Sequence, residues 1–163
     1  MKKLLILLLF CNSSLATTLD VCFTPGEKCA PKIVNEISHA QKQILVQAYS
    51  FTSQDIAMSL IKAKQKGVDV EVILDKSNIK DKHSVMRLLE LNNIPIKIDY
   101  TVSIAHNKVM IIDSKTVITG SYNFTTSAEK RNAENLLIIK DNQQIVNRYS
   151  NNWLSRNKVS KDT

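Results

Sequence analysis

The sequence contains few of the residues that interrupt regular structure, with three glycines and three prolines among its 163 residues. It has no low-complexity run. Beyond its N-terminus, no apolar segment reaches the roughly 20 residues that a bilayer-spanning helix needs. An apolar content of 44% is ordinary for a protein with a packed core. These features predict one compact domain with no linker, no internal repeat and no stable membrane insertion.

The first 16 residues follow a different pattern. A basic head at residues 1–3 precedes an unbroken apolar run at 4–10, and a small-residue stretch ends at Ala16. This order predicts a secretory signal peptide over residues 1–16, cleaved after Ala16, and a periplasmic or secreted domain over 17–163. The run is short for a membrane anchor and lacks the alternation of a half-buried strand. Acylation at Cys11 is disfavoured because the bulky Phe10 precedes it.

Removal of this leader changes the charge and the cysteine count. The formal net charge falls from +7 to about +5 with the loss of two lysines. Cys22 and Cys29 remain, and an even count in an exported chain predicts a disulfide between them. A metal site lacks a neighbouring histidine, whereas two free thiols stay an alternative. The residual positive charge suits a polyanion, either nucleic acid or an anionic lipid headgroup, or a solubilising surface.

Apolar periodicity predicts helices and strands that alternate through the first half of the chain. The second helix lies between a cap at Thr52 or Ser53 and a stop at Gly67, and Asp141 is expected to cap the last helix. This order predicts a layered α/β/α sandwich with a mixed, mostly parallel sheet. The other expected helices cover 31–43, 84–92 and 141–157, and 125–132 is expected to be a short helix or a turn. The expected strands cover 44–51, 68–74, 94–100, 108–112, 116–121 and 134–139, and 76–82 is a loop.

The segment from residue 106 to 134 concentrates polar groups beside apolar strands. Because side chains on a strand alternate between its faces, His106 and Lys108 are expected on one face. Asp113 is at odd separation from both and is expected on the other face or in the turn. Ser121 and Asn123 share a face if the second strand continues through them. A hairpin of these strands brings an imidazole, an ammonium, a hydroxyl and an amide to one pocket.

These groups suit chemistry at a phosphodiester. An imidazole can attack phosphorus or move protons near neutral pH. An ammonium and an amide N–H can hold the non-bridging oxygens as charge develops. Gly120 is the only glycine after Gly67, which indicates a close backbone approach or a positive φ there. A single histidine on a strand is more often structural, but a polar His-x-Lys face is costly beside an apolar core unless it is used.

The motif as a whole resembles the signature of the phospholipase D superfamily. From the first helix to the last, the chain is similar to the small single-motif bacterial endonucleases of that superfamily, the EDTA-resistant nuclease type. The matching pattern is His-x-Lys-x-x-x-x-Asp at His106, Lys108 and Asp113, followed by Gly120, Ser121 and Asn123.

The resemblance implies that the active site is shared between two copies of the chain. Neither His39 nor His83 begins a second His-x-Lys motif, so one motif per chain implies a symmetric homodimer. By analogy with the family, one His106 attacks phosphorus and forms a phosphohistidine. The other His106 protonates the leaving oxygen and then activates water. No metal and no cofactor are implied.

The resemblance also assigns roles to the neighbouring residues. Lys108 and Asn123 would hold the phosphate oxygens, with Ser121 in support. Glu134 lies where similar proteins place a carboxylate that orients the histidine ring. Asp113 is expected to be a structural anchor rather than a participant.

Three functions fit the sequence. The first is a non-specific endonuclease that cleaves DNA, with RNA as a second candidate substrate. The second is a phospholipase or cardiolipin hydrolase, which is expected to expose an apolar surface for acyl chains; the sequence shows none after the leader. The third is a nucleic-acid-binding module without turnover, which the intact motif disfavours. A role in scavenging, defence or as an effector is left open.

Overall fold

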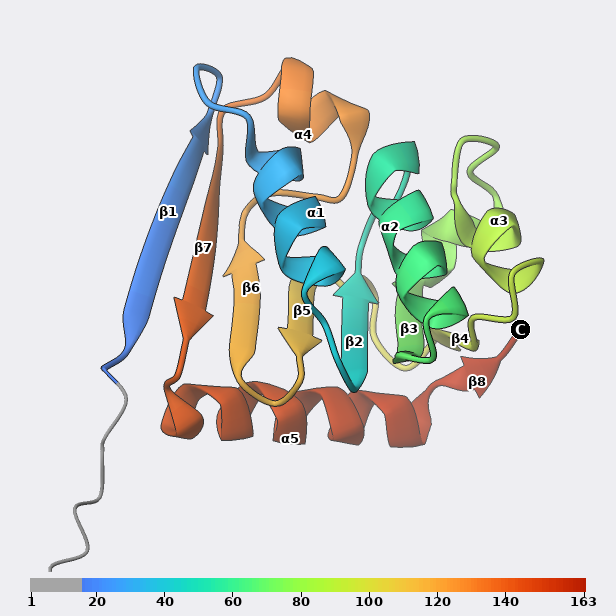
Figure 1. Cartoon of the computed structure of the whole chain (residues 1–163). Coiled ribbons are helices and arrows are strands. Elements are labelled where there is room, and N and C mark those ends of the chain that lie inside the picture. The colour runs from blue at the N-terminus through green and yellow to red at the C-terminus, as the bar shows by residue number, and fades with distance from the viewer. Residues whose placement is uncertain (1–15) are drawn as a thin grey trace, which may run out of the picture.

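The computed structural model describes residues 16–163 and forms one eight-stranded mixed sheet. The expected signal peptide lies outside the described residues except for Ala16, and it stays a prediction. The strands lie in the order β1-β7-β6-β5-β2-β3-β4-β8, so both edges carry segments that pair with distant parts of the chain (Figure 1). Their bounds are β1 Thr18–Thr24, β2 Gln43–Ala48, β3 Asp69–Asp75, β4 Ile96–Asp99, β5 Lys108–Ile112, β6 Thr116–Gly120, β7 Glu134–Lys140 and β8 Lys161–Asp162.

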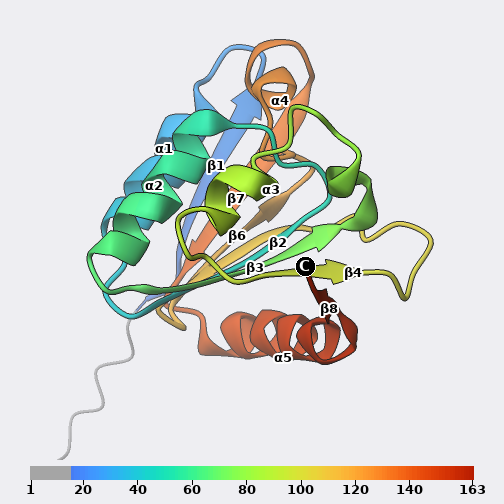
Figure 2. The same ribbon diagram turned by 90° about the vertical axis from the view of Figure 1, so that its right-hand side faces the viewer.

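Helices cover both faces of this sheet. The helices α1 and α2 lie on one face, and α5 lies on the opposite face (Figure 2). The expected α/β/α sandwich is therefore confirmed. The bounds are α1 Cys29–Ser38, α2 Gln54–Gln65, a 3-10 turn η1 at Lys76–Ile79, α3 Met86–Glu90, α4 Thr126–Lys130 and α5 Gln143–Val159.

The sheet is mixed as expected, but the expectation that it is mostly parallel is wrong. Its parallel pairs are β2–β3 and β3–β4, and the other described pairs are antiparallel. The reason lies in the connections. A parallel crossover needs a long segment, and the two parallel pairs are the ones whose strands are joined through α2 and through η1 and α3. The tight turn between β5 and β6 returns the chain antiparallel.

Three local features differ from the sequence-based expectations. The strand β1 was not expected, and it pairs along its full length with β7. The strand β2 ends at Ala48, and Phe51 makes only an isolated bridge to Phe124. The N-cap of α5 is Asn142, whose side chain accepts a hydrogen bond from the Ile145 N–H. Asp141 instead takes a positive φ of 58°, which turns the chain into the helix.

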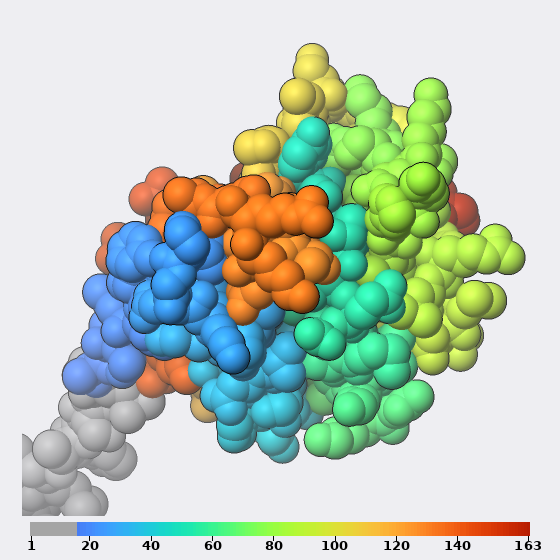
Figure 3. Space-filling model, turned by 90° about the horizontal axis from the view of Figure 1, so that it is seen from above, coloured from blue at the N-terminus to red at the C-terminus, as the bar shows by residue number. Residues whose placement is uncertain are grey.

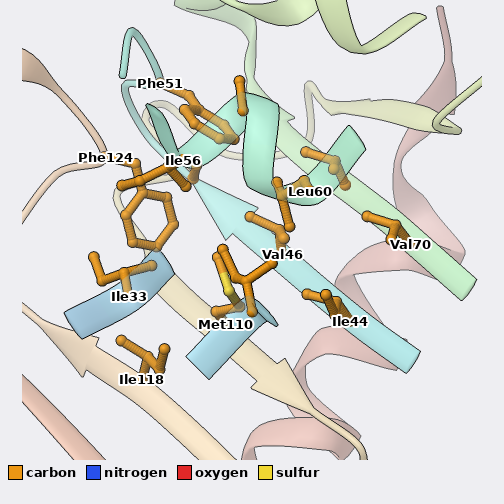
Figure 4. Packing of buried hydrophobic residues seen from close by; sticks show 14 of the residues in the cluster. Ile33, Ile44, Val46, Phe51, Ile56, Leu60, Val70, Met110, Ile118 and Phe124 are labelled. Atoms are coloured by element: carbon orange, nitrogen blue, oxygen red, sulfur yellow. The ribbon is translucent and has the colours of Figure 1, made fainter. Parts of the chain in front are cut away.

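The larger core lies between the sheet and the helices α1 and α2. Alternate residues of the central strands, including Val46, Met110 and Ile118, face helix residues such as Ile33 and Leu60 (Figure 4). Burying each such side chain stabilises the fold by about 1.5–3 kcal/mol. Above them, the rings of Phe51 and Phe124 meet edge to face with centroids 5.6 Å apart. These rings close the core directly beneath the loops that follow β2 and β6.

The expected disulfide is confirmed, since Cys22 of β1 is bonded to Cys29 at the start of α1. Both residues are buried. The bond therefore joins the edge strand to the helix that packs on its inner side.

Asp113 anchors the opposite end of the sheet from the His106 loop. Its carboxylate accepts the backbone N–H groups of Gln41, Lys42 and Gln43 at 2.7–3.0 Å. Burial raises the pKa of this carboxyl, but the three backbone hydrogen bonds outweigh that effect and hold the pKa below its usual value. Asp113 thus fixes the chain at the entry to β2, far from the His106 loop.

We expect Asp113→Asn to lower the free energy of unfolding by about 2 kcal/mol at neutral pH, because charged hydrogen bonds are lost. A carboxyl whose folded-state pKa is depressed stabilises the fold above its unfolded pKa, and this contribution disappears as the pH falls through the folded value. The difference between the two proteins should therefore shrink below about pH 4. Urea unfolding at a series of pH values measures it. Asp81→Asn is the matched control, because the Asp81 carboxylate accepts one backbone N–H, that of His83. An Asp113→Asn variant as stable as the parent at neutral pH would contradict this account.

Candidate active site

His106 lies in a loop that is tied to two strand ends. On one side, the backbone N–H of Ala105 donates to the buried carboxylate of Asp75 at 2.7 Å. On the other side, the N–H of Tyr49 donates to the carbonyl of Asn107 at 2.8 Å. The exposed imidazole is therefore carried on a backbone fixed at both neighbouring residues, which keeps the ring in place without burying it.

The side chains of His106 and Lys108 meet, as the sequence predicts, although His106 precedes the strand. Lys108 Nζ lies 2.9 Å from His106 Nδ1 and donates to the His106 carbonyl at 2.7 Å. The ring of Tyr49 packs against the imidazole with centroids 4.6 Å apart and lies 5.2 Å from the Lys108 ammonium. One aromatic ring therefore positions both groups, through stacking and a cation–π contact.

Lys108 is almost completely buried, with 6% of its surface exposed. This burial lowers the pKa of its ammonium, because the charged form loses hydration, and the negative charge of Glu134 partly offsets the effect. The ammonium and the Glu134 carboxylate thus interact across the site. A partly desolvated cation interacts strongly with any anion that reaches it.

The segment from Gly120 to Asn123 is held by its middle residue. Tyr122 is buried, and its hydroxyl donates to Glu129 Oε2 at 2.7 Å. Burial and this carboxylate together raise the pKa of Tyr122 far above its usual value, so it stays a neutral donor. The same Glu129 oxygen accepts the Cys29 N–H at the start of α1. The site segment and the first helix are therefore fixed by one carboxylate.

Both a positive φ and a close backbone approach, which the sequence offered as alternatives, apply at Gly120. Its φ is +140°, a conformation that side chains rarely adopt. A Cβ at this position would lie 2.3 Å from the carbonyl oxygen of Asn135. The close approach is to the neighbouring strand, so Gly120 shapes the turn that leads into Ser121.

Ser121 and Glu134 form a second polar cluster. Ser121 Oγ donates to Glu134 Oε2 at 2.6 Å and accepts the Asn135 N–H at 3.0 Å. The other Glu134 oxygen accepts from Asn132 Nδ2 at 2.8 Å. Within the described chain these are the hydrogen bonds of Glu134, and the imidazole has Lys108 as its partner. Glu134 therefore acts on the site through its charge and through Ser121.

Asn123 has an acceptor that nothing in the described chain satisfies. Its Oδ1 is buried and lacks a hydrogen-bond partner among residues 16–163. An unpaired buried polar atom costs about 1–3 kcal/mol, so this acceptor favours any hydrogen-bond donor that reaches it. The Asn123 side chain lines a polar cleft at this end of the sheet.

A polar cleft of about 820 Å³ opens beside Tyr49 and Asn123. Figure 3 looks onto this end of the molecule, where the segment around residue 50 (teal) lies between residues 120–135 (orange) and the loop near residue 82 (yellow-green). The cleft is lined by the cations Lys82 and Arg131 together with hydroxyl and amide side chains. On the other side of Tyr49, a hollow of about 490 Å³ is lined by Ile79, Tyr100 and Ile104 beside Lys76 and Lys80.

The structure thus brings together His106, Lys108, Ser121, Asn123 and Glu134 at one end of the sheet, and it places Asp113 at the other. Sequence reasoning missed three residues that hold the site. Tyr49 and Asp75 each stand at the carboxyl end of a parallel strand, which is a position where ligand sites gather and was the available signal. Glu129 carried no signal, since its partners lie about a hundred residues away.

Within residues 16–163, no three or more histidine, cysteine, aspartate or glutamate side chains cluster as they would to hold a metal ion. In the same part of the chain, the helices are too short or too polar to cross a bilayer.

An exposed imidazole beside a desolvated ammonium, at the open end of an α/β/α sandwich, defines a site for phosphodiester chemistry. Comparison with known proteins assigns the chain to the same class of enzyme, the phosphodiesterases. Residues 33–156 match the family model described as cardiolipin synthase, PLD-like domain. The chain therefore belongs to the phospholipase D superfamily of phosphodiesterases, as its motif indicated.

Individual relatives carry different names. The chain is 47% identical over 137 residues to a phospholipase D of Rickettsia conorii, covering 84% of this chain and 68% of the relative. It is 30% identical to the mouse mitochondrial cardiolipin hydrolase, covering 76% of this chain and 57% of that protein. Among solved structures, Nuc, a phospholipase D family member from Salmonella typhimurium, superposes with a TM-score of 0.86 at 31% identity. That match covers 91% of this chain and 99% of Nuc.

We expect Gly120→Ala to destabilise the protein by about 3 kcal/mol or more, because it combines strained φ with a backbone clash. Gly67→Ala is the matched control: its φ is +89° but no atom lies within 4 Å of the added methyl. The control should lose only about 1–2 kcal/mol. Thermal unfolding of both variants measures the difference. Equal losses would show that the contact with Asn135 does not constrain the turn.

We expect Glu134→Gln to lower the pKa of Lys108 further, because a negative charge that favours the ammonium is removed. The Lys108 side chain should then lose its proton at a lower pH than in the parent protein. A titration followed by NMR of the lysine side chains tests this. Glu36→Gln serves as the control, since Glu36 pairs with Lys140 instead. An unchanged or higher Lys108 titration midpoint in Glu134→Gln would refute the proposed coupling.

Proposed function

We propose that this protein is a metal-independent endonuclease that cleaves DNA, with RNA as a second substrate, in a site shared by two copies of the chain. The observation that carries the proposal is the polar cleft that ends at Tyr49. Its cations Lys82 and Arg131 and its many hydroxyls suit the phosphates of a nucleic acid strand. Tyr49 lines this cleft and also packs on the imidazole of His106, so a strand bound in the cleft would lie next to that imidazole.

In the proposed reaction, an imidazole nitrogen of His106 attacks phosphorus, and the bond from phosphorus to the leaving oxygen breaks. His106 of the partner subunit donates the proton that the leaving oxygen takes up. The same partner imidazole then removes a proton from water, which attacks phosphorus and releases His106. Lys108 and Asn123 hold the non-bridging oxygens, and no metal takes part.

The contact between Lys108 and the imidazole determines which ring nitrogen of His106 carries the proton before substrate binds. A protonated Lys108 can only donate, so at 2.9 Å it makes His106 Nδ1 an acceptor. A neutral ring then carries its proton on Nε2, which cannot attack. An arriving phosphate offers Lys108 a charged acceptor in place of the ring. Substrate binding thus frees Nδ1 to take the proton and leaves Nε2 as the nucleophile.

Export to the periplasm or the medium forms part of the proposal. The Cys22–Cys29 disulfide supports it, because such bonds persist in oxidising compartments. The charge of the chain suits the same polyanionic substrate.

A second candidate is a lipid phosphodiesterase, because apolar side chains are exposed near the site. The sequence did not indicate such a surface, yet Ile79, Tyr100 and Ile104 are 47%, 47% and 56% exposed. They line the hollow beyond Tyr49, next to lysines that suit anionic headgroups. These residues come from two loops that are separate in the sequence, which explains why no apolar run marked them.

Purified protein with excess EDTA, offered supercoiled plasmid, RNA and cardiolipin vesicles in parallel, tests the proposal. We expect plasmid nicking in EDTA, and a fall of about 10²–10⁴-fold or more in His106→Ala. His39→Ala is the control, since His39 lies at the far end of α1 and bonds within its own turn. Loss of cleavage in EDTA would contradict the metal-free mechanism. Lipid turnover without nicking would favour the second candidate, and nucleic acid binding without cleavage would favour a binding module.

A further inference from the structure

The loop formed by residues 100–107 joins β4 to β5 and carries His106 near its end. Figure 2 shows this segment (yellow) projecting from the body of the molecule beyond β4. Little burial holds its first half, because Tyr100, Val102 and Ile104 are exposed. The polar contacts at the two ends of the loop therefore have to fix it, and with it the position of the imidazole.

Two buried carboxylates hold the ends of this loop. Asp99, the last residue of β4, is completely buried and accepts the Thr101 N–H at 3.0 Å and the Thr101 hydroxyl at 2.7 Å. Asp75, the last residue of β3, is also buried and accepts the Ala105 N–H at 2.7 Å. In the parallel β3–β4 ladder, Asp75 and Asp99 are direct partners. The two anchors of the loop are therefore acidic side chains on one face of adjacent strands.

These neighbouring carboxylates are balanced by a cation from α5. Adjacent strands lie about 4.8 Å apart, so two negative charges on one face repel each other strongly where water is excluded. Arg156, in the last turn of α5, forms an ion pair with Asp99 and donates from Nε to its Oδ2 at 2.7 Å. A terminal nitrogen of the same guanidinium donates to the Thr101 hydroxyl oxygen. Burial raises the pKa of Asp99, but the hydrogen bonds from Arg156 and Thr101 outweigh this effect and hold the pKa below its usual value.

The helix α5 has other contacts that hold it on the sheet. Trp153 is buried, and its indole Nε1 donates to the Val46 carbonyl at 3.0 Å. Val146 packs in the same apolar cluster as Trp153. The guanidinium of Arg156 is directed elsewhere, since its hydrogen bonds lead to the end of β4 and to the second residue of the loop. Its contacts therefore connect the last helix to the loop that carries His106.

We propose that Arg156 is a positioning residue for the His106 loop and acts through Asp99 and Thr101. The inference rests on the proposed function, because the position of the loop affects the reaction only if His106 takes part in it. A reacting group displaced by about 1 Å can slow a reaction by about 10²-fold. Arg156 does not line the polar cleft, whose cations come from other segments. Loss of its guanidinium should therefore slow the chemical step and leave substrate binding nearly unchanged.

Arg156→Gln and Arg156→Lys test the proposal with two measurements. Hydrogen exchange of the buried Ala105 N–H, followed by NMR, should become about tenfold faster or more in Arg156→Gln. With a fluorogenic DNA oligonucleotide in EDTA, kcat should fall about tenfold while KM changes less than about twofold. Arg156→Lys should recover part of both losses, because lysine keeps the positive charge beside Asp99 but not the forked geometry. Arg87→Gln is the matched control, because Arg87 is exposed on α3, and it should change neither value.

A further variant covers the case in which Arg156→Gln does not fold, which its melting temperature would reveal. Thr101→Val leaves the ion pair in place and removes only the hydroxyl that joins the pair to the loop. Thr101 is exposed, so this variant should fold. We expect it to speed exchange at Ala105 and to lower kcat in the same direction as Arg156→Gln.

The outcomes separate this inference from the function itself. Unchanged exchange at Ala105 in these variants would overturn the proposal. Faster exchange with an unchanged kcat, a loss confined to KM, or equal losses in Arg156→Lys and Arg156→Gln would do the same. If the parent protein cleaves no substrate, the exchange measurement alone decides. Faster exchange then upholds the link between Arg156 and the loop, while the proposed nuclease fails.

Discussion

The site depends on the hydrogen bonds that fix the backbone on both sides of His106. Asp75 accepts the N–H of Ala105, and the carbonyl of Asn107 accepts the N–H of Tyr49. Both anchors come from the carboxyl ends of neighbouring parallel strands, so the sheet itself sets the position of the loop. The imidazole can then stay exposed and still be held in place. The buried Lys108 and the Tyr49 ring are arranged around that fixed loop.

A second constraint holds the opposite wall of the cleft. Tyr122 is buried between Ser121 and Asn123, and its bond to Glu129 joins this wall to the first turn of α1. Gly120 permits the turn that leads into the wall. The disulfide holds α1 to the edge strand. The N-terminal elements β1 and α1 are therefore joined to residues 120–129 beside the cleft, and a substitution that destabilises any of these contacts should disturb the site.

Much of this arrangement could be predicted from the sequence where the signal was local. The His-x-Lys spacing predicted that His106 and Lys108 lie together. The absence of any other glycine after Gly67 indicated a backbone role for Gly120, and the even cysteine count predicted the disulfide. Strand parity and the family resemblance together separated Asp113 from the site. The β-branched runs predicted the central strands, because burial on both faces leaves a clear apolar signature.

Other features depended on long-range pairing and left no local mark. The strand β1 alternates, but its apolar residues face outward and its partner β7 follows more than a hundred residues later. Most strand pairs are antiparallel because each of β5, β6, β7 and β8 pairs antiparallel to its neighbours in the sheet. In the sequence, nothing distinguished Glu129 from any other charged helix residue. Its role depends on contacts with Tyr122 and with the start of α1 that form only in the folded chain. The exposed apolar group of Ile79, Tyr100 and Ile104 comes from two separate segments, so it could be seen only in three dimensions.

The central claim is that His106 forms a covalent bond to phosphorus. The most direct measurement mixes the protein with a DNA oligonucleotide in EDTA, quenches in alkaline denaturant, where phosphohistidine persists, and analyses the peptides by mass spectrometry. The account predicts a peptide containing His106 that carries a nucleotide fragment through phosphorus, early in the time course and absent in His106→Ala. Efficient cleavage with no modified His106 peptide at any time would contradict it.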